Sequence, residues 1–408
     1  MTLMDRFLTR TFRRGMLTVV DHRGVARRFG VATPGFPEIG VRLADARVGR
    51  DIAARPRLGA GEAYMDGRLI VEGDDILGLI MLLRLNSRWE DGGAVRDAGL
   101  ARRALGGLVG RIDRINWARK SKRNVAHHYD LDDRLYELFL DDDRQYSCAY
   151  FTDPANSLEQ AQSDKKAHIA SKLALKPGQR VLDIGCGWGG MALYLHEKSG
   201  AEVLGVTLSE EQLKVARARA AAAGVSDRVK FELIDYRAVT GKFDRIVSVG
   251  MFEHVGPASY DAFFAKCRDL LTEEGVMLLH TVGRLGTPGV TDAWTARYIF
   301  PGAYSPSLSE IVTATEKLRL IVTDVETLRV HYAHTLRHWY ERTGAHRAEI
   351  EALYDVRFYR MWRFYLAGNV AGFQWGGMCN YQVQIARSRD ALPITRDYMA
   401  VEEERLRA

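Results

Sequence analysis

The sequence of 408 residues predicts an α/β protein built around a doubly wound, mostly parallel sheet. Two observations predict this fold. Short apolar runs of strand character alternate with helical segments between residues 180 and 282, as in successive strand-helix-strand units. The first run ends in a glycine-rich turn that leads into a helix, and doubly wound sheets bind their ligands at such carboxyl ends of strands.

The alternation gives the elements of the sheet in order. We expect strands at residues 180–184, 202–207, 229–234, 243–249 and 276–282, with helices at 188–199, 209–223 and 260–271. Helical segments at 308–318 and 333–364 and a late strand at 381–386 complete the sheet and its cover. In the N-terminal part, residues 61–67 are expected to form a turn before the mostly apolar stretch 76–85. Residues 283–307 are rich in glycine, proline and aromatic side chains, which is typical of a lid loop.

Size and composition exclude several classes of protein. The chain is long enough for two domains. The longest apolar run, residues 76–83, is much shorter than the ~20 residues of a membrane-spanning helix. Charged residues interrupt the place where a secretory signal would have its apolar segment. The chain has four widely spaced cysteines, Cys148, Cys186, Cys267 and Cys379, so neither a zinc site nor a disulfide framework is expected. This cysteine usage favours a reducing cytosol.

The charge is unevenly distributed along the chain. Residues 1–123 hold 24 Lys/Arg and 14 Asp/Glu, a net charge of +10, whereas residues 124–408 hold 34 and 38, a net charge of −4. A basic first part predicts an anionic partner. A helix over residues 3–14 would carry apolar side chains on one side and arginines on the other, which fits an interfacial helix and equally a helix that packs on its own domain.

The glycine-rich turn reads Asp-Ile-Gly-Cys-Gly-Trp-Gly-Gly over residues 183–190. Gly185 and Gly187 can adopt backbone angles closed to other residues and allow a ligand to approach the main chain. The glycine spacing departs from the dinucleotide fingerprint and resembles the S-adenosylmethionine-binding motif of class I methyltransferases. A glycine turn without a ligand is the simpler alternative.

Further segments resemble one family, the cyclopropane-fatty-acyl-phospholipid synthases and their mycolic acid cyclopropane synthase relatives, over nearly all of residues 60–386. The matching segments, together with Gln212 and Trp339, are HYD (128–130), YSCAYF (146–151), GVTLS (205–209), DRIVSVGMFEHVG (244–256), LHTVG (279–283) and YIFP (298–301). Each segment is weak by itself, but all of them occur in family order.

The resemblance implies transfer of a methylene unit from S-adenosylmethionine to a cis double bond of a phospholipid acyl chain. Attack of the alkene on the methyl group leaves a carbocation, and a base must then remove a proton for the ring to close. In the family this base is a bound bicarbonate. The residues that correspond to its ligands are Glu253, His280, Tyr332, and Cys148 and Val282 through their backbones.

The simpler readings are a core histidine for His280 and a carboxylate favoured at a helix N-terminus for Glu253. The cofactor contacts that the resemblance implies are Tyr146, Ser147, Asp183, Gly185, Gly187, Thr207, Gln212 and Tyr236. No metal is expected. Thr207 replaces the acidic residue that many methyltransferases use for the ribose. Asn369 stands where many family members have a cysteine, which excludes a covalent cysteine mechanism at that place.

The domain organisation follows from these assignments. We expect a class I methyltransferase fold with a smaller N-terminal domain: residues 1–95 contact lipid or membrane, 96–123 form a basic helical connector, and 124–408 form the catalytic domain with its acyl-chain site and lid. The expected partner is an anionic phospholipid membrane with unsaturated acyl chains. The protein would then be cytoplasmic and peripherally bound to the inner membrane surface, and the resemblance leaves a homodimer open.

Three other functions were compared with this one. A nucleic-acid base methyltransferase would carry an Asn/Asp-Pro-Pro-Tyr-like segment after the fourth strand, where this chain has residues 250–254, Gly-Met-Phe-Glu-His, so no nucleic-acid partner is expected. A related lipid methyltransferase would make a methyl- or methylene-branched acyl chain. A non-catalytic lipid-binding protein would not need Glu253, His280 and Tyr332 together.

Overall fold

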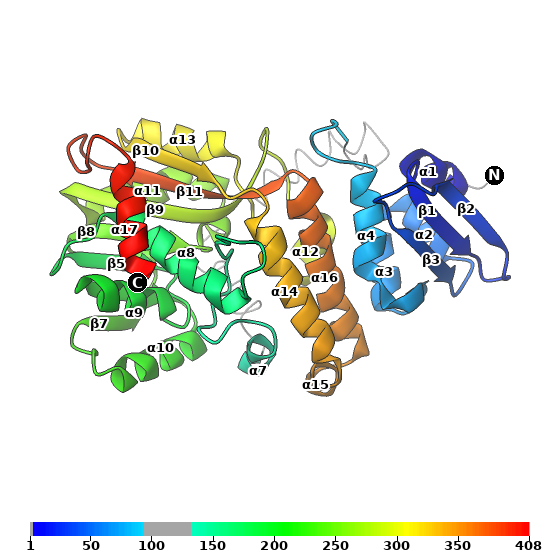
Figure 1. Ribbon diagram of the computed structural model, residues 1–408, viewed down its shortest axis with the longest axis horizontal. Coiled ribbons are helices and arrows are strands. Elements are labelled where there is room, and N and C mark those ends of the chain that lie inside the picture. Colours follow the sequence, from blue (N-terminus) through cyan, green and yellow to red (C-terminus); the bar gives the residue numbers. More distant parts are fainter. Residues whose placement is uncertain (1–2, 94–131, 408) are drawn as a thin grey trace. The chain divides into compact units, whose positions relative to one another are not determined.

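The computed structural model describes residues 3–93 and 132–407, which form two compact units (Figure 1). The first unit contains residues 3–93, Asp292–Pro301 and Ala333–Met378, and the second contains 132–291, Gly302–Tyr332 and 379–407. The predicted connector, residues 96–123, and the HYD segment at 128–130 lie outside the described residues. The N-terminal unit thus recruits segments from the second half of the chain, whereas the functional division into domains stays a prediction.

A seven-stranded sheet forms the centre of the second unit and confirms the predicted α/β class. Its order is β10 (Ile321–Thr327), β11 (Met378–Ala386), β9 (Leu271–Arg284), β8 (Phe243–Val249), β5 (Arg180–Ile184), β6 (Glu202–Thr207) and β7 (Val229–Leu233). The five strands from β9 to β7 are parallel, and β10 runs antiparallel to β11.

Helices cover both faces of this sheet because successive strand residues point to opposite sides. Val181 of β5 packs in one apolar cluster with α8 (Leu158–Leu173), α9 (Gly190–Ser199) and α10 (Glu210–Ala222). The next residue, Leu182, packs in the other cluster with α11 (Tyr260–Leu270) and α13 (Leu308–Lys317). The short elements of this unit are α7 (Asp133–Glu137), η2 (Tyr236–Ala238), η3 (Phe252–His254) and η4 (Pro257–Ser259).

The strand order places a crevice beside β5. From β5 the chain proceeds to β6 and β7 on one side, and β8 and β9 lie on the other side. The loops that follow β5 and β8 therefore diverge at the carboxyl edge of the sheet, which is where doubly wound sheets bind ligands.

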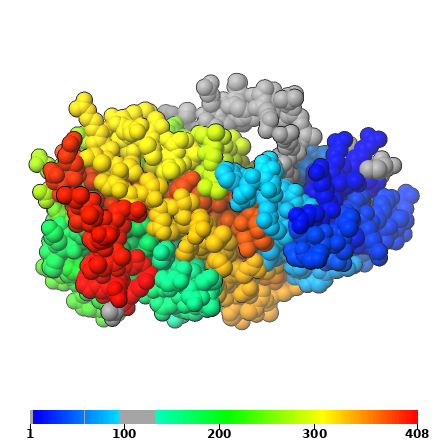
Figure 2. Space-filling view, turned by 45° about the horizontal axis from the view of Figure 1, so that its top comes forward, coloured from blue at the N-terminus to red at the C-terminus, as the bar shows by residue number. Residues whose placement is uncertain are grey.

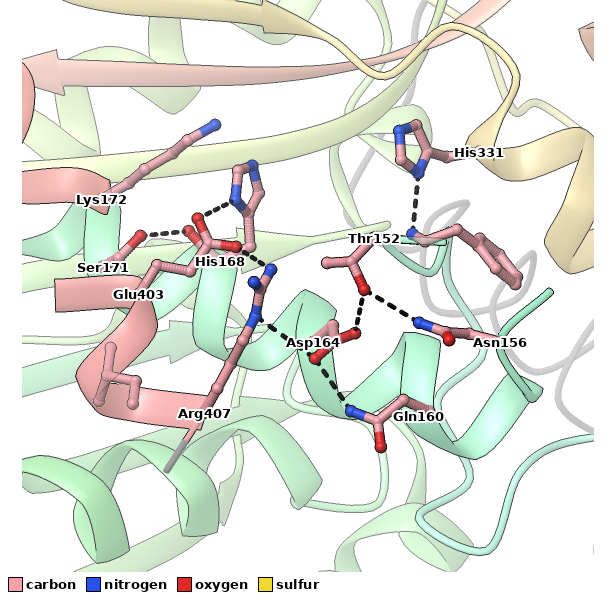
Figure 3. Close-up of polar contacts among 12 residues, drawn as sticks. Thr152, Asn156, Gln160, Asp164, His168, Ser171, Lys172, His331, Glu403 and Arg407 are labelled. Carbon is pink, nitrogen blue, oxygen red and sulfur yellow. Dashed lines mark hydrogen bonds and ion pairs between the residues drawn. The ribbon is translucent and has the colours of Figure 1, made fainter. Parts of the chain in front are cut away.

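The C-terminal helix α17 (Asp397–Arg407) lies along α8 and is held there by charged side chains (Figure 3). His168 of α8 lies 2.8 Å from Glu403 of α17 through Nδ1 and 2.7 Å from Glu326 of β10 through Nε2. Each ring nitrogen of His168 thus faces a carboxylate, one from α17 and one from β10. Arg407 adds an ion pair to Asp164 at 3.4 Å. Figure 2 shows α17, in red, as a surface helix of this unit.

The first unit contains a four-stranded sheet of order β2 (Ala26–Val31), β1 (Gly15–Val20), β3 (Glu38–Leu43) and β4 (Leu69–Val71). Its fully buried side chains include Ile76, Leu82, Trp339 and Trp362. Its helices are α1 (Leu3–Thr11), α2 (Val48–Ala54), α3 (Pro56–Met65), α4 (Ile76–Leu85), α12 (Ala293–Tyr298), most of α14 (His331–Ala345), α15 (Arg347–Leu353) and α16 (Val356–Trp375), with a 3-10 turn η1 (Glu72–Asp74).

One sequence-based interpretation was wrong in this unit, and a second missed a helix, while the lid role of that segment stays a prediction. Residues 61–67 were expected to form a turn, but α3 continues to Met65. Gly61 is a close-packing position rather than a turn glycine, because a Cβ there would lie 2.5 Å from Nε1 of Trp294 on α12. The expected lid loop, residues 283–307, contains the end of β9 and the helix α12.

Helix α1 packs on its own domain, since Leu8 and Phe12 are each 5% exposed, while Arg6 and Arg10 stay exposed. Among the helices of residues 3–93 and 132–407, none combines the length and the apolar composition that crossing a bilayer requires. In the same residues, no group of three or more His, Cys, Asp or Glu side chains is arranged to hold a metal ion.

Candidate active site

A pocket opens at the carboxyl ends of β5, β6, β7 and β8. All eight residues that the sequence associated with the cofactor line it: Tyr146, Ser147, Asp183, Gly185, Gly187, Thr207, Gln212 and Tyr236. The segment 249–251, at the end of β8, forms another part of the wall. The structure therefore brings together side chains that lie up to 90 residues apart, from Tyr146 to Tyr236, in one cavity.

The glycine turn after β5 has the backbone that its sequence predicts. Gly185 and Gly187 have φ angles of +84° and +54°, in the region that favours glycine. A Cβ on Gly185 would lie 2.8 Å from the Met251 side chain, whereas a Cβ on Gly187 would meet nothing within 4 Å. The main chain at Gly187 is thus open to a ligand.

Asp183, one residue before the end of β5, is a buried carboxyl group, 1% exposed. Burial raises its pKa to about 7, and the positive charge of Lys165 partly opposes this shift. Its Oδ2 atom has no hydrogen-bond partner among the residues that the structure describes. A buried oxygen without a partner costs free energy, so Asp183 is suited to a ligand that brings a donor.

On the next wall, Oγ1 of Thr207 donates to Oε1 of Gln212 at 3.1 Å, which fixes both side chains at the end of β6. Asp235 and Arg237 form an ion pair at the end of β7. Tyr236, between them, is only partly buried and packs edge-on against Phe263.

Glu253 lies in η3, between Met251 and His254, which both line the pocket. Its Oε1 atom accepts a hydrogen bond from the backbone N–H of Val282, whereas its Oε2 atom is buried without a partner. Burial raises its pKa to about 7 despite the hydrogen bonds that it accepts. The structure thus joins two of the predicted anion-binding residues and leaves one carboxyl oxygen able to bind a further donor.

His280 is completely buried, and both ring nitrogens are engaged. Nδ1 lies 3.1 Å from Nε2 of Gln382, and Nε2 lies 3.0 Å from the side-chain amide of Asn380. Lys172 fixes Gln382, because its ammonium donates to Oε1 of Gln382 at 2.7 Å and leaves the amide N–H to face His280.

This arrangement assigns the histidine tautomer. Nδ1 of His280 accepts from Gln382, so a neutral ring carries its proton on Nε2. Burial lowers the pKa of His280 well below its ordinary value, which keeps the ring neutral. Asn380 must then present its oxygen to Nε2, an amide orientation that also gives a partner to its otherwise unpaired Oδ1.

Cys148 and Tyr332 lie on segments that meet near the same sheet edge. Cys148 is fully buried, and its Sγ donates to the carbonyl of Ala149 at 3.3 Å. Three residues later, the N–H of Phe151 donates to Nδ1 of His331 at 3.0 Å, which connects this loop to the start of α14, where Tyr332 is 9% exposed.

Sequence reasoning missed the polar residues of β11 and α8. Asn380, Gln382 and Gln384 are buried at alternate positions of an otherwise apolar strand. A strand with amides at every second position has a polar stripe on one face, and that stripe needs partners. This pattern was the available signal. Lys172, their partner on α8, and the buried Lys165 on the same helix carry no comparable signal, because charged residues in a helix usually face solvent.

Known proteins resemble this chain closely. A family model described as mycolic acid cyclopropane synthetase matches residues 117–383. The chain is 38% identical over 365 residues to the cyclopropane-fatty-acyl-phospholipid synthase of Escherichia coli (strain K12), which covers 88% of this chain and 91% of the relative. It is 35% identical over 404 residues to the tuberculostearic acid methyltransferase UfaA1 of Mycobacterium tuberculosis (strain ATCC 25618 / H37Rv), covering 94% and 91%.

Among solved structures, mycolic acid cyclopropane synthase CmaA1 complexed with SAH and CTAB superposes with a TM-score of 0.62 and 34% identity. The match covers 65% of this chain and 98% of that chain.

The raised pKa of Glu253 predicts that Glu253→Gln stabilises the fold at neutral and alkaline pH. The unfolded chain ionises this carboxyl near 4.5, but the folded chain ionises it only near 7. Wild type therefore loses stability as pH rises from 4.5 to 7, and the variant does not. We expect the variant to be more stable by roughly 2 kcal/mol above pH 7 and equal to wild type near pH 4.

Urea unfolding at pH 4, 6 and 8 measures this difference. Glu349→Gln is the matched control, because that carboxylate is 59% exposed and should change stability by less than about 0.5 kcal/mol at each pH. A variant that is less stable than wild type at pH 8 would contradict the prediction, because it would show that other groups in the fold stabilise the ionised carboxylate of Glu253.

Proposed function

Because the chain belongs to the mycolic acid cyclopropane synthetase family, we propose that it converts the cis double bond of an unsaturated phospholipid acyl chain into a cyclopropane. The family resemblance seen in the sequence is confirmed, and the chain is an S-adenosylmethionine-dependent methyltransferase. One observation supports the ring-forming activity most. Glu253, a buried carboxyl with an oxygen unpaired among the described residues and a pKa of about 7, lies between two residues that line the cofactor pocket, Met251 and His254.

The pocket residues fit S-adenosylmethionine. Asp183 offers a buried, unpaired carboxyl oxygen to the amino group of the cofactor, and the open backbone at Gly187 lets the ligand approach closely. Thr207 and Gln212 form a polar wall for the ribose hydroxyls, and Tyr236 offers an apolar ring to the adenine. When bound, S-adenosylmethionine supplies an electrophilic methyl group.

The protein contributes positioning and a place for a proton. An alkene is a weak nucleophile, so holding it in line with the methyl group provides most of the rate. Closing the ring requires loss of one proton from the transferred carbon. Glu253 is about half ionised near pH 7, which suits a group that must accept a proton and then release it.

We propose that bicarbonate carries this proton between substrate and Glu253. The unpaired Oε2 of Glu253 would accept the hydroxyl of the ion, and the backbones of Cys148 and Val282 and the hydroxyl of Tyr332 would hold its oxygens. Both ring nitrogens of His280 already have partners, so a direct bond from His280 to the ion would replace its contact with Asn380.

We also propose peripheral association with the cytoplasmic surface of an anionic membrane. The apolar face of α1 packs inside its own domain, so the attraction would be electrostatic and would come from exposed arginines such as Arg6 and Arg10. A homodimer remains a prediction from the sequence.

A methyl-branched product is the second candidate, because a relative with 35% identity is a tuberculostearic acid methyltransferase. Branching without a new double bond needs a hydride donor, and this sequence carries no flavin or nicotinamide motif. The ring needs only a proton acceptor.

Trideuteromethyl-labelled S-adenosylmethionine distinguishes these products. Ring closure discards one deuteron, so the new carbon should keep two deuterons and the chain should resist mild catalytic hydrogenation. Lipid mass spectrometry with 1,2-dioleoyl phosphatidylglycerol vesicles measures both properties. Three retained deuterons would establish methyl branching, and two deuterons in a product that takes up hydrogen would establish an exocyclic methylene.

Carbonate removal tests the role of the ion. We expect turnover to fall at least about tenfold in carbonate-free buffer and to recover when bicarbonate is added, because the positioned base is lost. Glu253→Gln should lower kcat without weakening S-adenosylhomocysteine binding more than about twofold, since Glu253 acts after binding. Unchanged turnover in carbonate-free buffer would exclude the ion and leave Glu253 as the base.

Vesicle sedimentation tests the membrane contact. Arg6→Glu/Arg10→Glu should weaken binding to phosphatidylglycerol vesicles, at about 1 kcal/mol for each arginine near the surface, and salt should weaken wild-type binding. Lys214→Glu/Lys230→Glu makes the same charge change at exposed positions of the second unit and should have little effect. Equal loss of vesicle binding in both variants would show that binding depends on net charge and not on the position of the arginines.

A further inference from the structure

Lys165 is a buried cation next to the cofactor pocket that the proposed chemistry does not use. Its side chain leaves α8 and is completely buried. Its hydrogen bonds go to neutral oxygens, Oε1 of Gln145 at 2.5 Å and Oγ of Ser147 at 2.9 Å. Burial lowers its pKa to about 8, against the opposing effect of Asp141. An ammonium group in such a place is costly unless an anion completes its surroundings.

The nearby aspartates do not supply that anion within hydrogen-bonding contact. The carboxylate of Asp141 accepts from the backbone N–H groups of Asp143 and Gln145. Asp143 is engaged by Lys166 and Arg219. Both carboxylates therefore already have partners of their own.

Ser147 carries the effect of Lys165 into the pocket. An ammonium group can only donate, so Oγ of Ser147 accepts from Lys165 and its own hydrogen is directed elsewhere. Gln162 holds the same segment, because its amide donates to the carbonyls of Gln145 and Ser147 at 3.1 and 3.0 Å. Ser147 lines the pocket, so its hydroxyl is a fixed donor polarised by a positive charge behind it.

The two ends of the pocket differ in charge. At the end of β7, Asp235 is neutralised by Arg237. Near the end of β5, the unpaired Oδ2 of Asp183 lies within the electrostatic influence of Lys165. The β5 end of the pocket thus has a hydrogen-bond acceptor, Asp183, and a separate polarised donor, Ser147. This pair matches a ligand that carries both an ammonium group and a carboxylate.

We propose that Lys165 is a positioning residue that orients Ser147 toward the carboxylate of the amino-acid end of S-adenosylmethionine, while Asp183 receives the amino group. The inference rests on the cofactor assignment of this pocket. The inference gives α8 a role in cofactor selection. Lys165 does not line the cavity, yet the preference for the cofactor over molecules that lack the carboxylate would depend on it.

Calorimetric titration with two probes tests this role. S-adenosylhomocysteine has the carboxylate, and its decarboxylated analogue keeps the ammonium but lacks the carboxylate. Lys165→Met should weaken binding of S-adenosylhomocysteine about tenfold and binding of the analogue less than about twofold, the effect of one charge-assisted hydrogen bond. In turnover, the KM for S-adenosylmethionine should rise while kcat changes little.

Lys166→Met is the matched control, because this neighbour on α8 bears the same charge but pairs with Asp143. It should keep the wild-type preference for S-adenosylhomocysteine. An equal loss for both probes in Lys165→Met, or no loss for either, would overturn the inference. If Lys165→Met does not fold, Ser147→Ala decides: it must lose the preference, and a retained preference overturns the role.

The same experiment separates this inference from the cofactor assignment. Wild type that binds neither probe would overturn both. Wild type that binds S-adenosylhomocysteine with an unchanged preference in Lys165→Met would overturn only the role of Lys165.

Discussion

Three buried basic side chains on one side of α8 organise the second unit. Lys165, His168 and Lys172 are three and four residues apart, which places them on one face of the helix. Burying a polar or charged group without partners costs free energy, so each side chain fixes the groups that it binds. Lys165 fixes the segment at Ser147, His168 fixes β10 and α17, and Lys172 fixes Gln382 on β11. The pocket wall and the environment of His280 thus share one scaffold.

At the carboxyl edge of the sheet, in contrast, buried acidic groups lack some of their hydrogen-bond partners. Asp183 and Glu253 are buried, and each has an oxygen without a partner. Each such oxygen costs about 1–3 kcal/mol, which a fold under selection for stability alone would not keep. Because burial brings both pKa values to about 7, the charge of this edge is decided by whatever binds there. The basic side chains of α8 support the surrounding segments, and the acids with unpaired oxygens lie at the site.

The sequence predicted the parts of this fold that local rules determine. The strand at Arg180–Ile184 and the glycine turn follow from apolar periodicity and from the backbone freedom of glycine. The residues lining the pocket followed from a family pattern. In contrast, the segment that contains α12 looked like a loop in the sequence. In the structure, Asp292 caps a short helix there, and Trp294 of this helix packs against Gly61. That contact joins residues more than 200 positions apart, and no local rule contains it.

The environment of His280 also depends on contacts that the sequence alone does not predict. Its position in a strand was visible in the sequence, but its tautomer depends on Gln382, and the orientation of Gln382 depends on Lys172. Each step crosses between elements that are distant in the chain. A residue type and a spacing can therefore predict that a histidine belongs to a site, while its protonation depends on the tertiary network.

The connection between β8 and η3 links the two halves of the site. Gly250 has a φ of +67°, its N–H donates to the carbonyl of His280 at 2.9 Å, and a Cβ there would lie 3.8 Å from the Cβ of Ser147. It lines the cofactor pocket, and Glu253 follows three residues later. The positive φ lets the chain turn from the pocket wall into η3 without a longer loop. The spacing between Gly250 in the pocket wall and Glu253 is therefore determined by a three-residue step, so in the proposed mechanism a shift of this segment would alter cofactor binding and proton removal together.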